Sequence, residues 1–102
     1  MISIASLAVP AQAAASDSAQ LRELVRQDCG ACHGLRLGGG LGPGLRAGDL
    51  EGLAVDAIAA IVRNGVPDTA MPPWQALLSE QEIQWISRKL KSGSLLRGND
   101  PR

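Results

Sequence analysis

The sequence predicts an all-α domain built from three main helices, and three observations favour this class. Apolar residues recur at helical spacing in three separate stretches of the 102-residue chain. No stretch shows the apolar–polar alternation that is typical of a half-buried strand. The two segments between the helices are rich in glycine or proline, which suit loops better than helix interiors.

The first two predicted helices are amphipathic. The first covers residues 18–28 and the second covers residues 53–64. Their apolar positions, which share one face at helical spacing, are Leu21, Leu24 and Val25 in the first helix and Val55, Ile58, Ala59 and Val62 in the second. Gly65 then provides a favourable stop for the second helix, because glycine accepts the left-handed backbone that is common at helix ends.

The third predicted helix has the clearest start in the chain. The run Ser79-Glu80-Gln81-Glu82 is a capping box, in which the serine hydroxyl accepts from the Glu82 amide and that glutamate reaches back to the serine amide. Apolar residues follow at positions 83, 86 and 90, and basic residues near the end suit the helix dipole. Gly93 is expected to end the helix and to leave residues 93–102 as a flexible tail.

Residues 1–15 have the character of an export-signal remnant. This stretch is apolar and then turns small and Ala-rich, and Ala11-Gln12-Ala13 has the form of a cleavage site. No Lys or Arg precedes Arg22, so the usual positive start is missing, and an Ala-rich N-terminal arm is the alternative. No later stretch is apolar over the ~18 residues that a membrane span needs. The sequence therefore predicts an exported protein without a membrane span.

Composition limits what the remaining domain, residues 16–92, can be. Ten basic and ten acidic residues give a net charge of zero, whereas a nucleic-acid binder normally has a large positive balance. The chain has no Phe or Tyr and only two Trp, and much of its apolar content is Ala, which buries little area. A small domain of this kind has difficulty building a core from its own side chains. A bound cofactor is therefore expected to supply the centre of the fold.

The motif Cys29-Gly-Ala-Cys32-His33 is the candidate site for that cofactor. C-x-x-C-H is the attachment signature of c-type haem. Residues three apart at the end of a helix share a face, so both sulfurs can reach the two vinyl groups along one haem edge and form thioethers. The imidazole of His33 can then come under the iron as the proximal ligand.

Three other interpretations use the same residues. The cysteines could form a structural disulfide of an exported protein, a thioredoxin-like redox pair or half of a zinc site. The chain has no further Cys or His to complete a zinc site, and no strand is expected before the motif, as a thioredoxin-like pair requires. A disulfide gives His33 no role and does not fill the core. Covalent haem is therefore the favoured interpretation.

Met71 is the candidate for the second axial ligand. The other methionine, Met1, belongs to the leader. Met71 lies in the run AMPPW, where two prolines restrict the backbone and can hold the sulfur at a fixed height. The alternative is a methionine that fills a gap in the core. Ligation by His33 and Met71 leaves no open coordination position and suits outer-sphere electron transfer.

Two further residues are candidate haem contacts. Pro43 lies ten residues after His33, and a backbone carbonyl there can accept from the other ring nitrogen, which fixes the ring and raises its basicity. An ordinary turn proline is the alternative. Trp74 can donate its indole N–H to a haem propionate, whereas Trp85 is expected to pack between the terminal helices. Eight of the twelve glycines lie between positions 30 and 48, and we expect them to fit closely over one haem face.

The order of these features resembles a monohaem class I cytochrome c. The runs QDCGACHGLRLGGGLGPGL and GVPDTAMPPWQALLSEQEI are similar, more narrowly, to the small periplasmic cytochromes c associated with the nitrite reductase of denitrifying bacteria. The resemblance implies haem attachment at Cys29 and Cys32, axial ligation by His33 and Met71, and support of the proximal histidine by the Pro43 carbonyl. The crossing helices of such proteins usually each carry an aromatic residue, and here the N-terminal helix has none.

The resemblance also implies a function. We expect a monomeric periplasmic protein with one covalent haem c, which donates electrons to a redox partner, nitrite reductase, without bond-making catalysis. An accessory role in maturing the specialised haem of that reductase is the alternative. A gas-binding haem protein, in which Met71 is displaced, is the third possibility. Neither nucleic acid nor a membrane span is expected.

Overall fold

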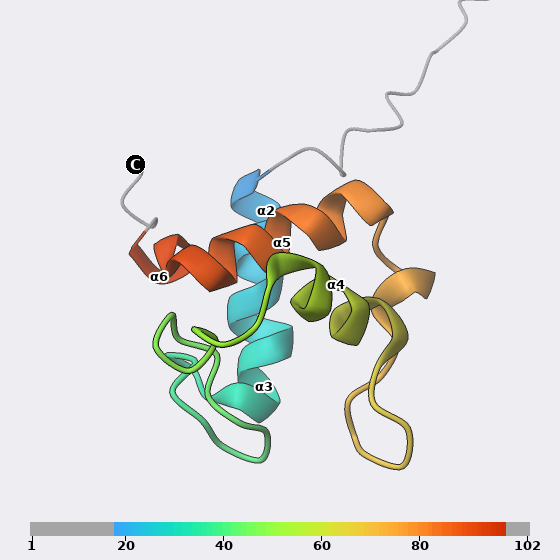
Figure 1. Cartoon of the computed structure of the whole chain (residues 1–102), viewed down its shortest axis with the longest axis horizontal. Coiled ribbons are helices and arrows are strands. Elements are labelled where there is room, and N and C mark those ends of the chain that lie inside the picture. The colour runs from blue at the N-terminus through green and yellow to red at the C-terminus, as the bar shows by residue number, and fades with distance from the viewer. Residues whose placement is uncertain (1–17, 98–102) are drawn as a thin grey trace, which may run out of the picture.

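Three helical segments organise the part of the chain that the computed structural model describes, residues 18–97 (Figure 1). Every regular element within these residues is a helix and none is a strand, so the predicted all-α class is confirmed. The predicted export signal, residues 1–15, lies outside the described residues, as do residues 98–102. None of the helices in the described range combines the length and the apolar character needed to cross a membrane.

The N-terminal helix is longer than predicted. The sequence suggested an end at Asp28, but the helix continues through α2 (Ser18–Leu24), the π-helical turn η1 (Val25–Cys29) and α3 (Gly30–His33). After the π turn, the Gly30 amide donates to the Val25 carbonyl, five residues earlier. A π turn holds more residues per turn than an α-helix, so a search for a 3.6-residue period does not reveal it.

The π turn changes which residues of this helix face the core. Its buried positions are Leu21, Val25, Gly30 and His33, which are four, five and three residues apart. A strict α-helical phase from Val25 would instead bring positions 28, 29 and 32 to the buried face. The irregular turn therefore directs His33 inward and leaves both cysteines at intermediate exposure.

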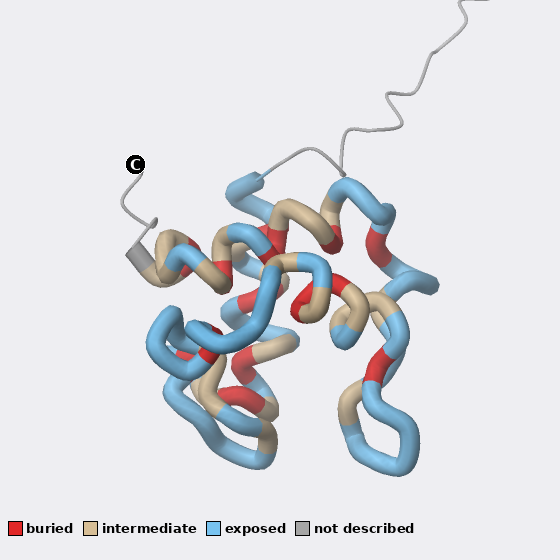
Figure 2. The backbone as a smooth tube through the Cα atoms, in the orientation of Figure 1, coloured by how far each residue is buried: buried red, intermediate tan, exposed pale blue. Residues whose placement is uncertain are grey.

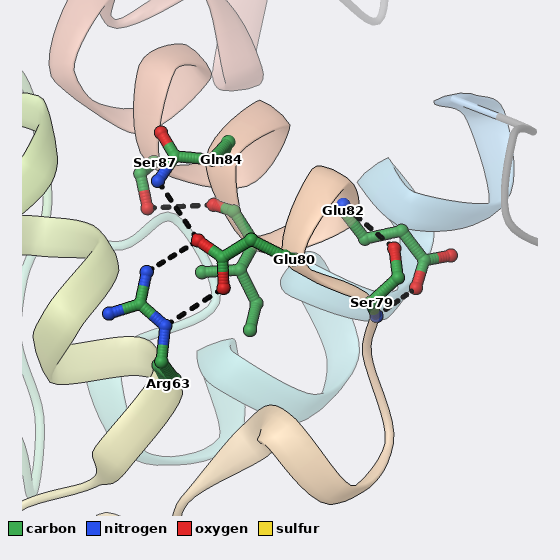
Figure 3. A network of polar contacts seen from close by, with 7 residues as sticks. Arg63, Ser79, Glu80, Glu82, Gln84 and Ser87 are labelled. Atoms are coloured by element: carbon green, nitrogen blue, oxygen red, sulfur yellow. Dashed lines mark hydrogen bonds and ion pairs between the residues drawn. The ribbon is translucent and has the colours of Figure 1, made fainter.

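The second and third helices match the predicted elements closely. Helix α4 (Val55–Asn64) starts two residues later than predicted, and it ends at Gly65, whose φ of 71° favours glycine. Helix α5 (Glu80–Ser92) starts at the predicted capping box (Figure 3). There the Glu82 amide donates to Ser79 Oγ at 3.1 Å, and the Ser79 amide donates to Glu82 Oε1 at 2.7 Å.

Helices α4 and α5 pack against each other and are joined at the surface by an ion pair (Figure 3). Arg63 Nε donates to Glu80 Oε1 at 2.8 Å, and Arg63 Nη2 donates to the other carboxylate oxygen. Gln84 Nε2 also donates to this carboxylate, at 3.1 Å. These hydrogen bonds, that of Arg63 first, lower the pKa of Glu80 to about 2. The carboxylate therefore keeps its charge well into the acidic range.

The core of the described residues is aliphatic, and Figure 2 marks the buried positions along the backbone in red. Its buried side chains come from all three helical segments and from the loops, and they are Leu21, Val25, Leu37, Leu50, Ile58, Ala59, Leu78, Ile83, Ile86, Leu90 and Leu95. Trp74 and Trp85 are only half-buried and pack against the edge of this cluster. The buried cluster of the described residues contains no aromatic side chain, which agrees with the thin core expected from composition.

The chain after α5 differs from the flexible tail that the sequence suggested from residue 93 onward. Gly93 ends α5 in a left-handed conformation, with φ of 80°. Ser94–Arg97 then form a further short helix, α6. Leu95 in this helix is 1% exposed and belongs to the core cluster. The tail prediction is therefore wrong for residues 94–97, because burial of an apolar side chain stabilises a segment that local signals leave unassigned.

Arg22 joins the two ends of the described chain. It lies in α2, and its Nη1 donates to the carbonyls of Ser94 and Leu95 at 3.1 and 3.0 Å. Its guanidinium also lies over the Trp85 ring, 5.5 Å from the ring centroid, and the Lys89 ammonium lies 5.6 Å from the same centroid. Trp85 thus packs between the terminal helices as predicted, and on α2 it contacts the Arg22 guanidinium where an aromatic partner is usual.

Candidate haem site

Both cysteines of the C-x-x-C-H motif lie at the end of the N-terminal helix. Cys29 closes the π turn and Cys32 follows in α3, so the two sulfurs are three residues apart on helical backbone. Both thiols are free and neither is fully buried. Burial raises the pKa of the Cys29 thiol to about 11, with smaller contributions from the charges of Asp28 and Cys32. An uncharged thioether sulfur suits this environment, because it carries no charge to be desolvated.

His33 is held in one orientation by a backbone carbonyl. The ring is buried at 9% exposure, and its Nδ1 lies 2.7 Å from the carbonyl oxygen of Pro43. A carbonyl only accepts, so Nδ1 carries the proton and donates. The lone pair of the neutral imidazole is then on Nε2, which is the nitrogen free to bind a metal. This hydrogen bond is the contact that the sequence suggested for Pro43.

The glycine-rich loop folds back against the end of α3. The Gly39 amide donates to the His33 carbonyl at 2.8 Å, and the Gly42 amide donates to the Cys32 carbonyl at 2.7 Å. These bonds use carbonyls that the end of the helix leaves without an intrahelical partner. The loop is therefore attached to the C-x-x-C-H motif on both sides of its histidine.

Met71 lies in a second loop that is closed by its own hydrogen bonds. The Val66 amide donates to the Met71 carbonyl at 3.1 Å, and the Met71 amide donates to Thr69 Oγ1 at 3.2 Å. Thr69 Oγ1 in turn donates to the Val66 carbonyl at 2.7 Å. A Cβ on Gly65 would lie only 2.7 Å from the Met71 carbonyl oxygen, so the absence of a side chain there lets the loop close. The Met71 backbone is thereby held in place, with the residue at intermediate exposure.

The two loops extend from the same side of the helices in Figure 1, at the lower left and the lower right. The structure brings His33 and Pro43 into direct contact, whereas Met71 lies on the separate loop. Trp74 begins the short 3-10 helix η2 (Trp74–Ala76) that follows the Met71 loop, and it packs against the core. Its predicted propionate contact stays a prediction.

These residues fit a covalently attached haem. Two free thiols at helical spacing supply the attachment chemistry, and a buried imidazole held through Nδ1 can offer Nε2 to an iron. The backbone at Gly42 lies so close to the His33 ring that a Cβ there would be 2.6 Å from ring atom Cε1. Over residues 18–97, no group of three or more His, Cys, Asp and Glu side chains is arranged to hold a metal ion. The cysteines also form no disulfide with each other.

A helical fold with C-x-x-C-H at a helix end and a carbonyl-held histidine defines the class of c-type cytochromes. Comparison with protein families agrees, because the model described as "Cytochrome C oxidase, cbb3-type, subunit III" matches residues 16–88. The chain belongs to this family of c-type cytochrome domains. Covalently bound haem c is therefore its cofactor.

The chain is similar to several curated proteins named cytochrome c55X. It is 51% identical to that of Pseudomonas aeruginosa over 77 residues, which are 76% of this chain and 65% of the relative. It is 48% identical to that of Paracoccus denitrificans over 82 residues, 80% of this chain and 78% of the relative. The chain thus spans just under two thirds of the Pseudomonas aeruginosa protein.

A solved structure supports the fold. The chain is similar to a c-type cytochrome NirC at 49% sequence identity and a TM-score of 0.74, over 76% of this chain and 92% of the other. The expected class I cytochrome c-like architecture is thereby confirmed at the level of the fold. The narrower resemblance to the small cytochromes of denitrifying bacteria is confirmed by the same relatives.

Two features of the site were not found by sequence reasoning. The π turn before Cys29 is one, and the contact of Gly42 with the imidazole is the other. The motif begins at Cys29, four residues after the apolar Val25, so its spacing in the sequence gives no signal for the π turn. No local pattern distinguishes Gly42 from the other glycines of the loop.

Proposed function

We propose that the protein is a periplasmic electron carrier that donates electrons to nitrite reductase. In this proposal the haem is attached through Cys29 and Cys32, and its iron is held by His33 and Met71. The resident haem supplies a one-electron Fe(III)/Fe(II) couple. The similarity to cytochrome c55X and to NirC, which are associated with denitrification, supports this choice of reductase.

The observation that carries the proposal is the contact between His33 Nδ1 and the Pro43 carbonyl. The Pro43 carbonyl accepts the Nδ1 proton at 2.7 Å, which leaves Nε2 as the ligand atom and makes the imidazole a stronger donor. The backbone bonds from the Gly39 and Gly42 amides hold the loop against the chain on both sides of the histidine. Little rearrangement is then needed at the proximal side when the iron changes its charge.

The Met71 loop supports a closed coordination sphere. Its hydrogen bonds through Thr69 and Val66 fix the main chain on either side of the thioether, and two prolines follow. A thioether ligand raises the reduction potential of a haem, and occupation of both axial positions leaves no place for a substrate. The site therefore suits electron transfer without bond-making catalysis.

The covalent cofactor is tested by a pyridine haemochrome spectrum together with the intact mass of the periplasmic protein. One covalent haem per chain is expected. A chain that carries no haem, or that carries one when Cys29 and Cys32 are both replaced by Ala, would contradict the assignment.

The ligand set is tested with Met71→Ala. The variant should bind carbon monoxide in the reduced state, lose the weak red absorption band of Met–iron ligation in the ferric state and have a lower potential. Leu77→Ala is a suitable control, because this exposed apolar residue directly follows η2. An unchanged potential in Met71→Ala would exclude Met71 as a ligand.

The partner is tested by mixing the reduced protein with purified nitrite reductase. Rapid oxidation of the cytochrome, followed at its α band, is expected of a donor. Slow oxidation, combined with a deletion strain whose reductase lacks its specialised haem, would instead indicate the role in haem maturation. The expected monomer is checked by size-exclusion chromatography of the holoprotein.

A further inference from the structure

We propose that Gly42 is a positioning residue for the axial histidine: its bare backbone forms the wall against which the His33 imidazole lies. The inference rests on the proposed function only in taking His33 as an iron ligand. It adds a residue that sets the orientation of that ligand and thereby tunes the potential of the haem.

The contact is unusually close. A Cβ built on Gly42 would lie 2.6 Å from His33 Cε1, 2.8 Å from Nδ1 and 3.2 Å from Nε2. These three atoms form the edge of the ring that contains both nitrogens. Real Cβ atoms essentially never come within 3.0 Å of another heavy atom. Any side chain at position 42 must therefore displace either the ring or the loop.

Backbone conformation does not explain why position 42 is a glycine. The glycines with positive φ in the described residues are Gly34, Gly39, Gly65 and Gly93, and Gly42 is not among them. An alanine at position 42 thus meets no conformational penalty of the left-handed region. The close approach of the imidazole is the remaining structural reason for a glycine here.

Neither partner can move away at low cost. The Gly42 amide donates to the Cys32 carbonyl at 2.7 Å, and the Gly42 carbonyl accepts from the Gly40 amide at 2.9 Å. The ring is held at Nδ1 by the Pro43 carbonyl, at its other end by α3, and at Nε2 by the iron of the proposed function. A Cβ at position 42 would push the loop outward and lengthen the bond between Pro43 and Nδ1.

The expected consequence is electronic. A weaker hydrogen bond at Nδ1 makes the imidazole a poorer electron donor to the iron. Loss of electron donation destabilises Fe(III) relative to Fe(II). The potential of a Gly42→Ala variant should therefore rise relative to the natural protein. The variant should still carry one covalent haem, because both cysteines are unchanged.

The experiment compares Gly42→Ala with two matched controls from the same loop. A Cβ on Gly48 meets nothing within 4 Å, and a Cβ on Gly40 meets the Cys32 carbonyl oxygen at 2.9 Å but none of its three nearest contacts is a ring atom. We expect a raised potential and altered ferric low-spin EPR g values in Gly42→Ala and no change in Gly48→Ala. Gly40→Ala crowds the Cys32 carbonyl that accepts from the Gly42 amide, and it therefore reports a disturbed loop without a side chain against the ring. An unaltered Gly42→Ala, or an equal shift in Gly40→Ala, would overturn the proposal.

A measurement on the natural protein keeps the test decisive if Gly42→Ala does not accumulate. In proton NMR of the ferrous holoprotein, the Gly42 Hα protons should give cross-peaks to Hε1 of His33. Their absence would overturn the proposal. If the His33 ring protons lack the large ring-current shift of an iron-bound imidazole, His33 is not the iron ligand and the proposed function fails. The cross-peaks then report separately whether Gly42 lies against the ring. Neither readout depends on Met71 or on the identity of the redox partner.

Discussion

Replacing Arg22 with alanine is expected to lower the free energy of unfolding by about 2 kcal/mol. Arg22 is half-buried in α2 and donates to the carbonyls of Ser94 and Leu95 in α6 at 3.1 and 3.0 Å. It also lies 5.5 Å from the centroid of Trp85 in α5. One side chain thus connects the N-terminal helix with both C-terminal helices.

The magnitude follows from these contacts. The two hydrogen bonds come from one nitrogen at a half-buried site and together contribute about 1.5 kcal/mol net, since water can partly replace the lost donor. The cation–π contact adds about 0.5 kcal/mol at this exposure. With a urea dependence of about 1 kcal/mol per M for a domain of this size, the midpoint should fall by about 2 M.

The assay is urea unfolding of the ferric holoprotein, followed by far-UV circular dichroism at constant ionic strength. Arg26→Ala is the matched control, because Arg26 is an exposed arginine one turn further along the same helical segment. Arg22→Lys should fall between the two, because a single ammonium retains the charge without the planar fork of a guanidinium. If Arg22→Ala lowers the free energy of unfolding no more than Arg26→Ala does, the contacts of Arg22 do not stabilise the fold.

Three further predictions concern the C-terminal half of the chain. Ser79→Ala should destabilise the protein by about 1 kcal/mol and lower its melting temperature by about 4–8 °C, since it removes the serine oxygen of the capping box; a shift of less than a degree in a thermal melt would contradict this. Leu95→Ala should cost about 2–3 kcal/mol in urea unfolding because Leu95 is 1% exposed, whereas Leu77→Ala, at 73% exposure, should cost less than about 0.5 kcal/mol; similar small costs for both would mean that α6 is not part of the folded core. The pKa of Glu80 is lowered from 4.5 to about 2 by its hydrogen bond to Arg63, so the stability linked to it is fully present above pH 4.5 and is lost as the pH falls toward 2. Glu80→Gln should lose this pH dependence, and midpoints for the two proteins that stay parallel between pH 4.5 and 2 would argue against the ion pair.

Features that depend on neighbouring residues could be predicted from the sequence. The capping box that starts α5 involves only residues 79 and 82, and the stop at Gly93 needs only the local backbone freedom of glycine. The C-x-x-C-H motif is similarly local, because one helical turn brings its three functional side chains together. The contact of His33 with Pro43 spans a loop of ten residues, and it was accessible through the family resemblance.

Features that depend on contacts between distant residues either differed from the sequence-based prediction or were not predicted at all. The N-terminal helix continues past Asp28 through a π turn, which changes the phase of the helix so that Gly30 and His33 are buried. Helix α6 forms at the end of the described chain because Leu95 is buried, and the Arg22 side chain, more than seventy residues away in the sequence, binds its carbonyls. Local propensity carries no information about such partners.

The haem site combines both kinds of information. The chemistry of the proposed site depends on residue types that the sequence shows directly: two thiols, an imidazole and a thioether at positions 29, 32, 33 and 71. The orientation of these groups comes from the folded backbone, which directs Nδ1 of His33 to a carbonyl and brings an unsubstituted Gly42 against the ring. Residue types specify which bonds a site can form, whereas packing specifies the direction in which they form, because direction depends on atoms that only the fold brings close.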